Sequence, residues 1–220
     1  MRKQLKKAIK SREEPQLEES IKKYKTIEPT KSLDSLVKKA KNLLEMLKCS
    51  KGLSSAVLSR VIADIQSAVD RIKKGGFDEL SSDVASAEKL LLRLRHLERL
   101  RSEVLELKQS TIAELRSYKQ PIPVIHNVMK ATYMLLGVPE NETKKWSSIQ
   151  TLLGKTGKDG LKRRISTFKE TSVTLEIARR AKHLIGQEED LESIRDVSAG
   201  AATFYLWVTG MVEEVLHNAQ

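Results

Sequence analysis

Residues 90–123 read LLLRLRHLERLRSEVLELKQSTIAELRSYKQPIP, a long leucine-rich stretch that stops at two prolines. Apolar or small side chains return along it at steps of three or four residues, from Leu90 to Tyr118. The average step of about 3.5 residues is typical of a coiled-coil helix. Because no Gly or Pro lies between Ser81 and Tyr118, the pattern predicts one uninterrupted, stalk-like helix over residues 81–120, ended by Pro121 and Pro123.

Residues 31–80, which precede this helix, predict a helical hairpin. Leu33–Leu47 places apolar residues on one face, and we expect Gly52 to close that helix. A second amphipathic pattern covers Val57–Ile72 and stops at Gly75-Gly76, directly after two lysines. A basic last turn followed by glycine suits a helix C-terminus.

Residues 1–30 are rich in charge and are interrupted by Pro15 and Pro29. They predict two weak helices, over Arg2–Arg12 and Gln16–Thr26, in a basic and partly flexible segment.

Residues 121–220 predict a compact cluster of short helices that ends in a short returning helix. The expected helices are Val124–Leu136, Glu142–Leu153, Leu161–Phe168, Leu175–Ile185, Leu191–Val197 and Ser198–His217. No segment has the alternating pattern of a strand, and the chain has only two Trp, four Tyr and three Phe. The predicted fold is therefore all-α.

Composition limits the classes of function. The formal net charge is +11, and residues 1–118 carry 26 Lys/Arg against 17 Asp/Glu, whereas residues 119–220 carry 14 against 12. This excess predicts an acidic partner, which could be nucleic acid, an anionic membrane surface or an acidic protein polymer.

A lone cysteine, Cys49, cannot form an internal disulfide. No stretch reaches the ~20 apolar residues of a membrane span, and we expect a soluble intracellular protein.

No pattern indicates catalysis or a bound cofactor or metal. Gly154-Lys155-Thr156 looks like the end of a phosphate-binding loop, but Ile149 stands where that loop needs its first glycine. The four histidines are scattered and form no metal-binding or acid–base grouping. We therefore expect a protein that is not an enzyme.

Residues 107–215 carry a series of short motifs in a fixed order. The motifs are Glu114-Leu115-Arg116-Ser117-Tyr118-Lys119-Gln120-Pro121, Val124–Met129 with Leu135-Leu136-Gly137, Trp146-Ser147-Ser148-Ile149 with Leu152-Leu153, Leu161, Ile165 and Phe168, and Val197–Ala202 with Trp207. In this order and spacing they resemble the microtubule-binding domain at the tip of the dynein heavy-chain stalk. The resemblance implies an incoming coiled-coil helix and a cluster of six helices, the last of which returns as the second strand of the stalk.

The chain departs from that family at three positions. Its prolines are separated by Ile122, a lysine common on the first helix is His126 here, and the basic residue often found before the returning tryptophan is Leu206. The returning helix is also far shorter than its partner. We therefore expect Leu90, Leu94 and Leu97 to pack against the N-terminal helices instead.

The resemblance implies non-catalytic binding to microtubules, as a cytoskeletal or ciliary adaptor. The microtubule-binding candidates are His126, Lys130, Lys155, Lys158, Lys162, Arg163 and Arg164. The expected structural anchors are Pro121, Pro123, Trp146, Phe168 and Trp207. The implied partner is tubulin, with other cytoskeletal or axonemal proteins as alternatives, and the implied location is the cytoplasmic cytoskeleton, cilium or axoneme.

Three other readings stay open at this point. The chain could be an excised stalk region of a dynein motor chain whose ATPase lies elsewhere, although the residues before Ser81 predict stacked hairpins rather than a continuing coiled coil. It could be a helical scaffold that keeps the fold and binds a protein other than tubulin. Nucleic-acid binding is disfavoured, because the basic half has little aromatic interleaving and no recognised module. No membrane partner is expected.

Overall fold

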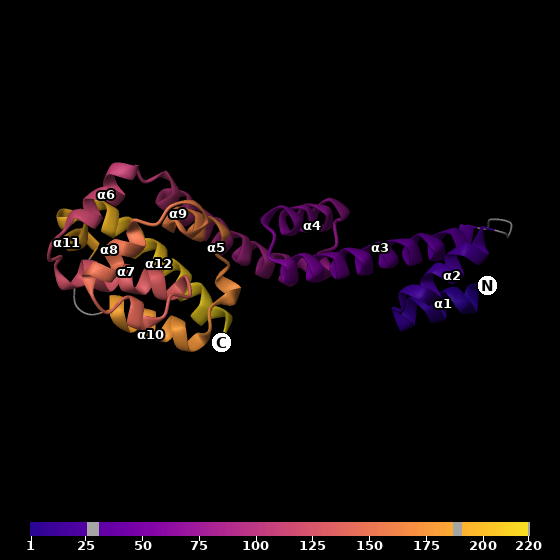
Figure 1. Cartoon of the computed structure of the whole chain (residues 1–220). Coiled ribbons are helices and arrows are strands. Elements are labelled where there is room, and N and C mark those ends of the chain that lie inside the picture. The colour runs from indigo at the N-terminus through magenta and orange to yellow at the C-terminus, as the bar shows by residue number, and fades with distance from the viewer. Residues whose placement is uncertain (26–30, 187–190, 220) are drawn as a thin grey trace. The chain divides into compact units, whose positions relative to one another are not determined.

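The computed structural model describes residues 1–25, 31–186 and 191–219, and every regular element within these ranges is a helix (Figure 1). The all-α prediction is therefore confirmed. The chain divides into two compact units, an N-terminal unit of residues 1–94 and a C-terminal unit of residues 95–220, each described by itself below. The break predicted at Pro29 and the end of the helix predicted over Gln16–Thr26 lie outside the described residues.

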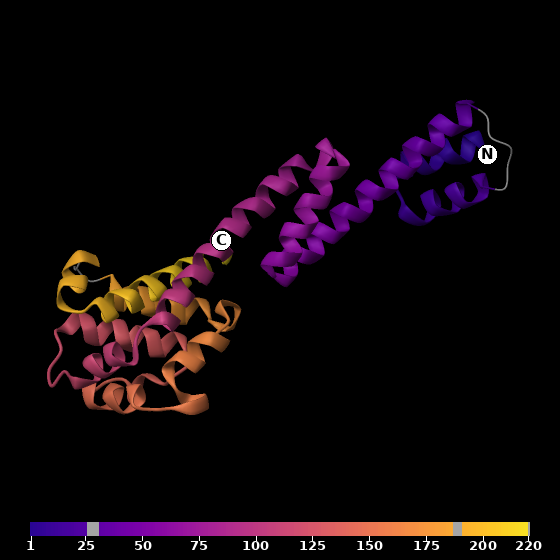
Figure 2. The same ribbon diagram turned by 90° about the horizontal axis from the view of Figure 1, so that it is seen from above.

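The N-terminal unit consists of antiparallel helices around two small cores (Figure 2). Its elements are α1 (Arg2–Ser11), α2 (Glu14–Tyr24), α3 (Lys31–Ser59), α4 (Ile62–Gly75), η1 (Asp78–Leu80, a 3-10 helix) and the first half of α5 (Ser81–Glu106). The helices α1 and α2 pack on each other and on the beginning of α3, where Leu5 and Leu17 are fully buried. The helix α4 packs on the second half of α3, with Ile65 and Val69 buried.

The stop predicted at Gly52 is wrong, because α3 continues to Ser59. One glycine inside a helix costs only about 1 kcal/mol, and the burial of Leu53 and Ala56 on the same face outweighs this cost. The chain turns instead at Arg60, whose φ is 56°. The predicted end of the next helix is confirmed, because Gly76 closes α4 in the left-handed conformation with φ 65°.

The single helix predicted over residues 81–120 is also wrong. The helix α5 ends at Glu106, Lys108 is extended, and α6 (Gln109–Ser117) begins directly after it. The side chain of Lys162 accounts for this break: its Nζ donates hydrogen bonds to the carbonyl oxygens of Leu105 (2.8 Å) and Leu107. Carbonyls that would lack a partner at the end of α5 are thereby satisfied.

The leucines of α5 belong to two cores. Leu90 and Leu94 pack in the core of the N-terminal unit, as expected. Leu97 does not, because it lies with Leu100 in the core of the C-terminal unit. The returning helix, α12 (Ala199–Asn218), lies close to Leu97 and Leu100 at Gly210. A Cβ added at Gly210 would lie 2.4 Å from Leu100 Cδ1 and 3.5 Å from Leu97 Cδ2. Only glycine allows so close an approach of the two helices.

The C-terminal unit is built around its last helix, which contacts α6, α7, α10, α11 and η4. After α6, its elements are α7 (Pro123–Leu135), η2 (Glu140–Glu142), α8 (Trp146–Leu153), η3 (Gly157–Asp159), α9 (Leu161–Thr167), η4 (Glu170–Ser172), α10 (Leu175–Ile185), α11 (Leu191–Val197) and α12 (Ala199–Asn218). The described part of residues 121–220 thus holds six α-helices, the number that the resemblance implied. Pro123 opens α7 at its first position, where a missing N–H costs nothing.

The aromatic anchors lie inside this unit. Trp207 is fully buried, and its ring meets Phe168 edge-on with centroids 5.2 Å apart. Trp146 is 9% exposed and donates from Nε1 to the carbonyl oxygen of Tyr118 at 2.7 Å. This bond ties α8 to the end of α6, and Pro121, which follows α6 in the sequence, is half-buried. The prediction that both tryptophans are buried is confirmed.

Candidate functional site

Three of the predicted basic residues, Lys155, Lys158 and Arg163, are exposed on residues 154–163, here called the α8–α9 segment. None of the three forms an ion pair with a carboxylate in the described ranges. Gly157 bends the segment with φ 64°, and an added Cβ at Gly160 would lie 3.2 Å from the carbonyl oxygen of Gly157. Its glycines therefore allow a tight turn that leaves the three cations facing solvent.

Arg116, which the sequence did not indicate as a site residue, extends this group of charges. Its guanidinium lies over Gly154, where an added Cβ would be 2.8 Å from Arg116 Cζ. A shallow cleft of about 430 Å³ separates α6 from the α8–α9 segment, with Ile112 and Leu153 on its walls and Arg116 and Lys155 among its lining. An acidic side chain placed here would meet two cations. Only the fold brings α6 and this segment together, so sequence spacing gave no signal.

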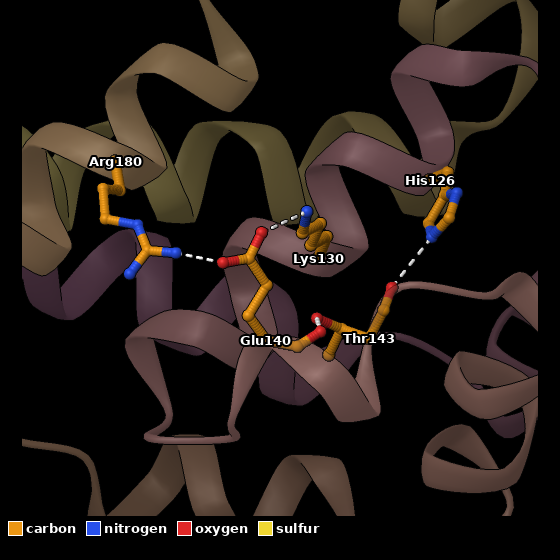
Figure 3. Close-up of polar contacts among 5 residues, drawn as sticks. All are labelled: His126, Lys130, Glu140, Thr143 and Arg180. Carbon is orange, nitrogen blue, oxygen red and sulfur yellow. Dashed lines mark hydrogen bonds and ion pairs between the residues drawn. The ribbon is translucent and has the colours of Figure 1, made fainter.

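Lys130 does not face a partner, because it is held inside a polar cluster (Figure 3). Its Nζ lies 2.9 Å from Glu140 Oε1, and its side chain is only 17% exposed. The other oxygen of Glu140 accepts from Arg180 of α10. The hydrogen bond from Lys130, its charge and that of Arg180 hold the pKa of Glu140 below its ordinary value. The cluster joins α7, η2 and α10.

His126 also makes an internal contact (Figure 3). Its Nε2 lies 3.0 Å from the carbonyl oxygen of Thr143, and because a carbonyl can only accept, Nε2 carries the hydrogen. The imidazole meets the ring of Trp146 edge-on, with centroids 5.8 Å apart. His126 therefore fixes the loop before α8 to α7.

Lys162 and Arg164 complete the set of predicted residues that support the fold. Lys162 holds the end of α5, as described above. Arg164 donates from Nη2 to the carbonyl oxygen of Leu136 at 2.7 Å, which ties α9 to the end of α7. The seven predicted residues thus do not form one exposed surface, since four of them make internal contacts.

The chemistry available to the described residues is limited. They contain no group of three or more His, Cys, Asp or Glu that could hold a metal ion. The Cys49 thiol is buried, and desolvation raises its pKa, which makes it a weak nucleophile. None of the helices in these ranges is long and apolar enough to cross a membrane.

Two curated proteins are similar to this chain. The cytoplasmic dynein 2 heavy chain 1 of Chlamydomonas reinhardtii is 27% identical over 202 residues, which cover 86% of this chain and 4% of the heavy chain. The human cytoplasmic dynein 2 heavy chain 1 is 22% identical over 194 residues, or 82% of this chain and 4% of the heavy chain. No family model and no solved structure matches.

These similarities support a dynein-related region. The chain spans about 4% of the length of the curated relatives it matches. Because 86% of the chain is much more than residues 107–215, the similarity also includes part of the N-terminal unit, which the sequence motifs did not assign.

Proposed function

We propose that this chain is a non-catalytic microtubule-binding module related to the dynein stalk tip. The observation that carries the proposal is the group of exposed cations Lys155, Lys158 and Arg163, beside Arg116, in a chain similar to dynein heavy chains. Tubulin is strongly acidic, so such a group would favour rapid association that weakens with added salt. A cytoskeletal location, in the cytoplasm, cilium or axoneme, belongs to the same proposal.

The proposed contact surface is narrower than the seven residues considered at first. His126, Lys130, Lys162 and Arg164 keep internal partners, and we assign them to the support of the fold. Reversal of Arg164 would break its bond to the Leu136 carbonyl, so it cannot test binding separately from folding. The α8–α9 segment provides cations that can be changed without loss of a described hydrogen bond.

Co-sedimentation with microtubules tests the proposal. Lys155, Lys158 and Arg163 are replaced together by Glu, and a matched control replaces the exposed Lys169, Arg179 and Lys182 by Glu. Both variants change the net charge by the same amount. We expect the first variant to lose at least about tenfold in affinity at low salt, where surface charges are least screened, and the control to stay much closer to the parent.

Two results would contradict this assignment. Equal losses in both variants would mean that only total charge matters. A parent that does not pellet even at low salt would leave a scaffold for another protein as the remaining interpretation.

A second candidate is a stalk segment of a longer dynein motor chain. The match over 82–86% of this chain favours it, because the similarity extends beyond the C-terminal unit. An antibody raised against residues 109–117 distinguishes the two candidates on an immunoblot. A band near the 24.8 kDa of this sequence supports a separate module, whereas a band many times larger supports a motor chain.

A further inference from the structure

The exposed face of α1 is entirely basic or uncharged. Arg2, Lys3, Lys6, Lys7 and Lys10 are all exposed, and the helix contains no acidic residue. None of these five cations pairs with a carboxylate among the residues that the structure describes. Their charges therefore point into solvent as one continuous stripe along the helix.

This arrangement opposes the stability of α1 itself. Cations in a first turn face the positive end of the helix dipole, and α1 has no acidic residue there to offset them. Lys3 and Lys7, and likewise Lys6 and Lys10, stand four residues apart, where like charges repel. The helix stays in place because Leu5 and Ala8 on its inner face are buried against α3. An external polyanion would relieve the repulsion.

The surroundings of the stripe restrict the shape of that polyanion. The neighbouring helix α2 contacts α1, and its exposed Glu18 and Glu19 are ion-paired with Lys48 and Lys23. These two carboxylates of α2 therefore already have basic partners, and the five cations of α1 do not pair with them. At about 1.5 Å per residue, the ten-residue α1 is about 15 Å long, which an extended peptide of about five residues matches at up to about 3.4 Å each.

We propose that the exposed face of α1 binds an extended, glutamate-rich polypeptide, whose alternate side chains place about three carboxylates along its five cations. The proposal is independent of the microtubule contact, because it uses no residue of the α8–α9 segment.

Other polyanions fit this stripe less well. A membrane-surface helix buries its own apolar face in the bilayer, but the apolar face of α1 is already used in the core. For single-stranded nucleic acids, the exposed face of α1 has no aromatic residue on which bases could stack.

Fluorescence anisotropy with a labelled octaglutamate peptide tests this binding on the full chain. One variant replaces Lys3, Lys6, Lys7 and Lys10 by Gln, which keeps helix propensity and removes four charges. The matched control removes four exposed charges elsewhere in the same unit, at Lys41, Lys51, Lys74 and Lys89. We expect the α1 variant to bind about tenfold more weakly at low salt, and the control to bind within about twofold of the parent.

Thermal unfolding of the same variants checks that they remain folded. Loss of like-charge repulsion should leave the thermal midpoint of the α1 variant at or above that of the parent, so weaker binding would not reflect unfolding. Equal binding by parent and α1 variant, or equal losses in α1 variant and control, would overturn the proposal. The parent is also tested with single-stranded DNA and with phosphatidylserine vesicles. If it binds either of these more tightly than the peptide, and the α1 variant loses that binding, the choice of a polypeptide as the ligand is overturned.

Discussion

Replacement of Trp207 by Ala gives the sharpest test of the C-terminal core. The indole is fully buried and meets Phe168 edge-on at 5.2 Å. A buried aromatic side chain removes about 150–250 Å² from water, which at about 25 cal/mol per Å² corresponds to about 4–6 kcal/mol. Alanine retains part of this burial and the core relaxes partly, so we expect a loss of about 3–5 kcal/mol in the free energy of unfolding.

Replacement of Trp207 by Phe separates packing from hydrogen bonding. The Nε1 of Trp207 is buried and has no hydrogen-bond partner among the described residues. Phenylalanine removes this unpaired donor and keeps the ring contact, so we expect a loss of only about 1–2 kcal/mol. Trp146→Phe should cost more than Trp207→Phe, because Trp146 donates to the Tyr118 carbonyl at 2.7 Å.

Urea denaturation followed by tryptophan fluorescence measures these differences. Both tryptophans lie in the C-terminal unit, so the one that remains in each variant reports on the unfolding of that unit. A loss below about 1 kcal/mol for Trp207→Ala would refute the burial argument, since core truncations of aromatic residues cost more than this. Equal losses of unfolding free energy in Trp207→Ala and Trp207→Phe would contradict the argument that the ring contact, and not the unpaired Nε1, stabilises the core.

Three further predictions concern the break in the long helix, the polar cluster and the N-terminal core. Lys162→Met should destabilise the protein by about 1–2 kcal/mol in urea, because two carbonyls lose a charged donor, whereas Lys158→Met, at an exposed position, should stay within about 0.5 kcal/mol. The parent should be more stable than the Glu140→Gln variant above the ordinary glutamate pKa of 4.5, and this difference in stability should disappear as the pH falls through the lowered pKa of Glu140. Thermal melts of both proteins from pH 7 to 3 measure the difference, and an equal difference at all pH values would contradict the ion pairs. Deletion of residues 1–75 should expose Leu90 and Leu94 and cause self-association in light scattering; a deletion variant that stays monomeric would show that the N-terminal helices do not cover them.

The sequence predicts the elements whose causes are local. The glycine that ends α4 follows a basic last turn, and the helix expected over Ser198–His217 is observed as α12. The heptad-like leucines of α5 likewise predict a long helix, although not its division between two cores.

The features that the sequence missed depend on contacts between distant residues. At the break after α5, the carbonyl oxygens of Leu105 and Leu107 accept hydrogen bonds from Lys162, which lies 55 residues beyond Leu107 in the sequence. In the same way, Lys130 looks like a free cation in the sequence, but Glu140 and Arg180 approach it only once η2 and α10 are in place. Charge alone cannot tell an exposed lysine from one that joins helices. Only the folded structure therefore distinguishes the candidate residues that are exposed from those that make internal contacts.

Sedimentation of the unmodified chain with microtubules tests the central claim most directly. We expect the chain to pellet at low salt, to dissociate as salt screens the exposed cations, and to bind less well to microtubules whose acidic tails have been removed. A chain that stays in the supernatant with intact microtubules at low salt would contradict the proposed microtubule-binding function.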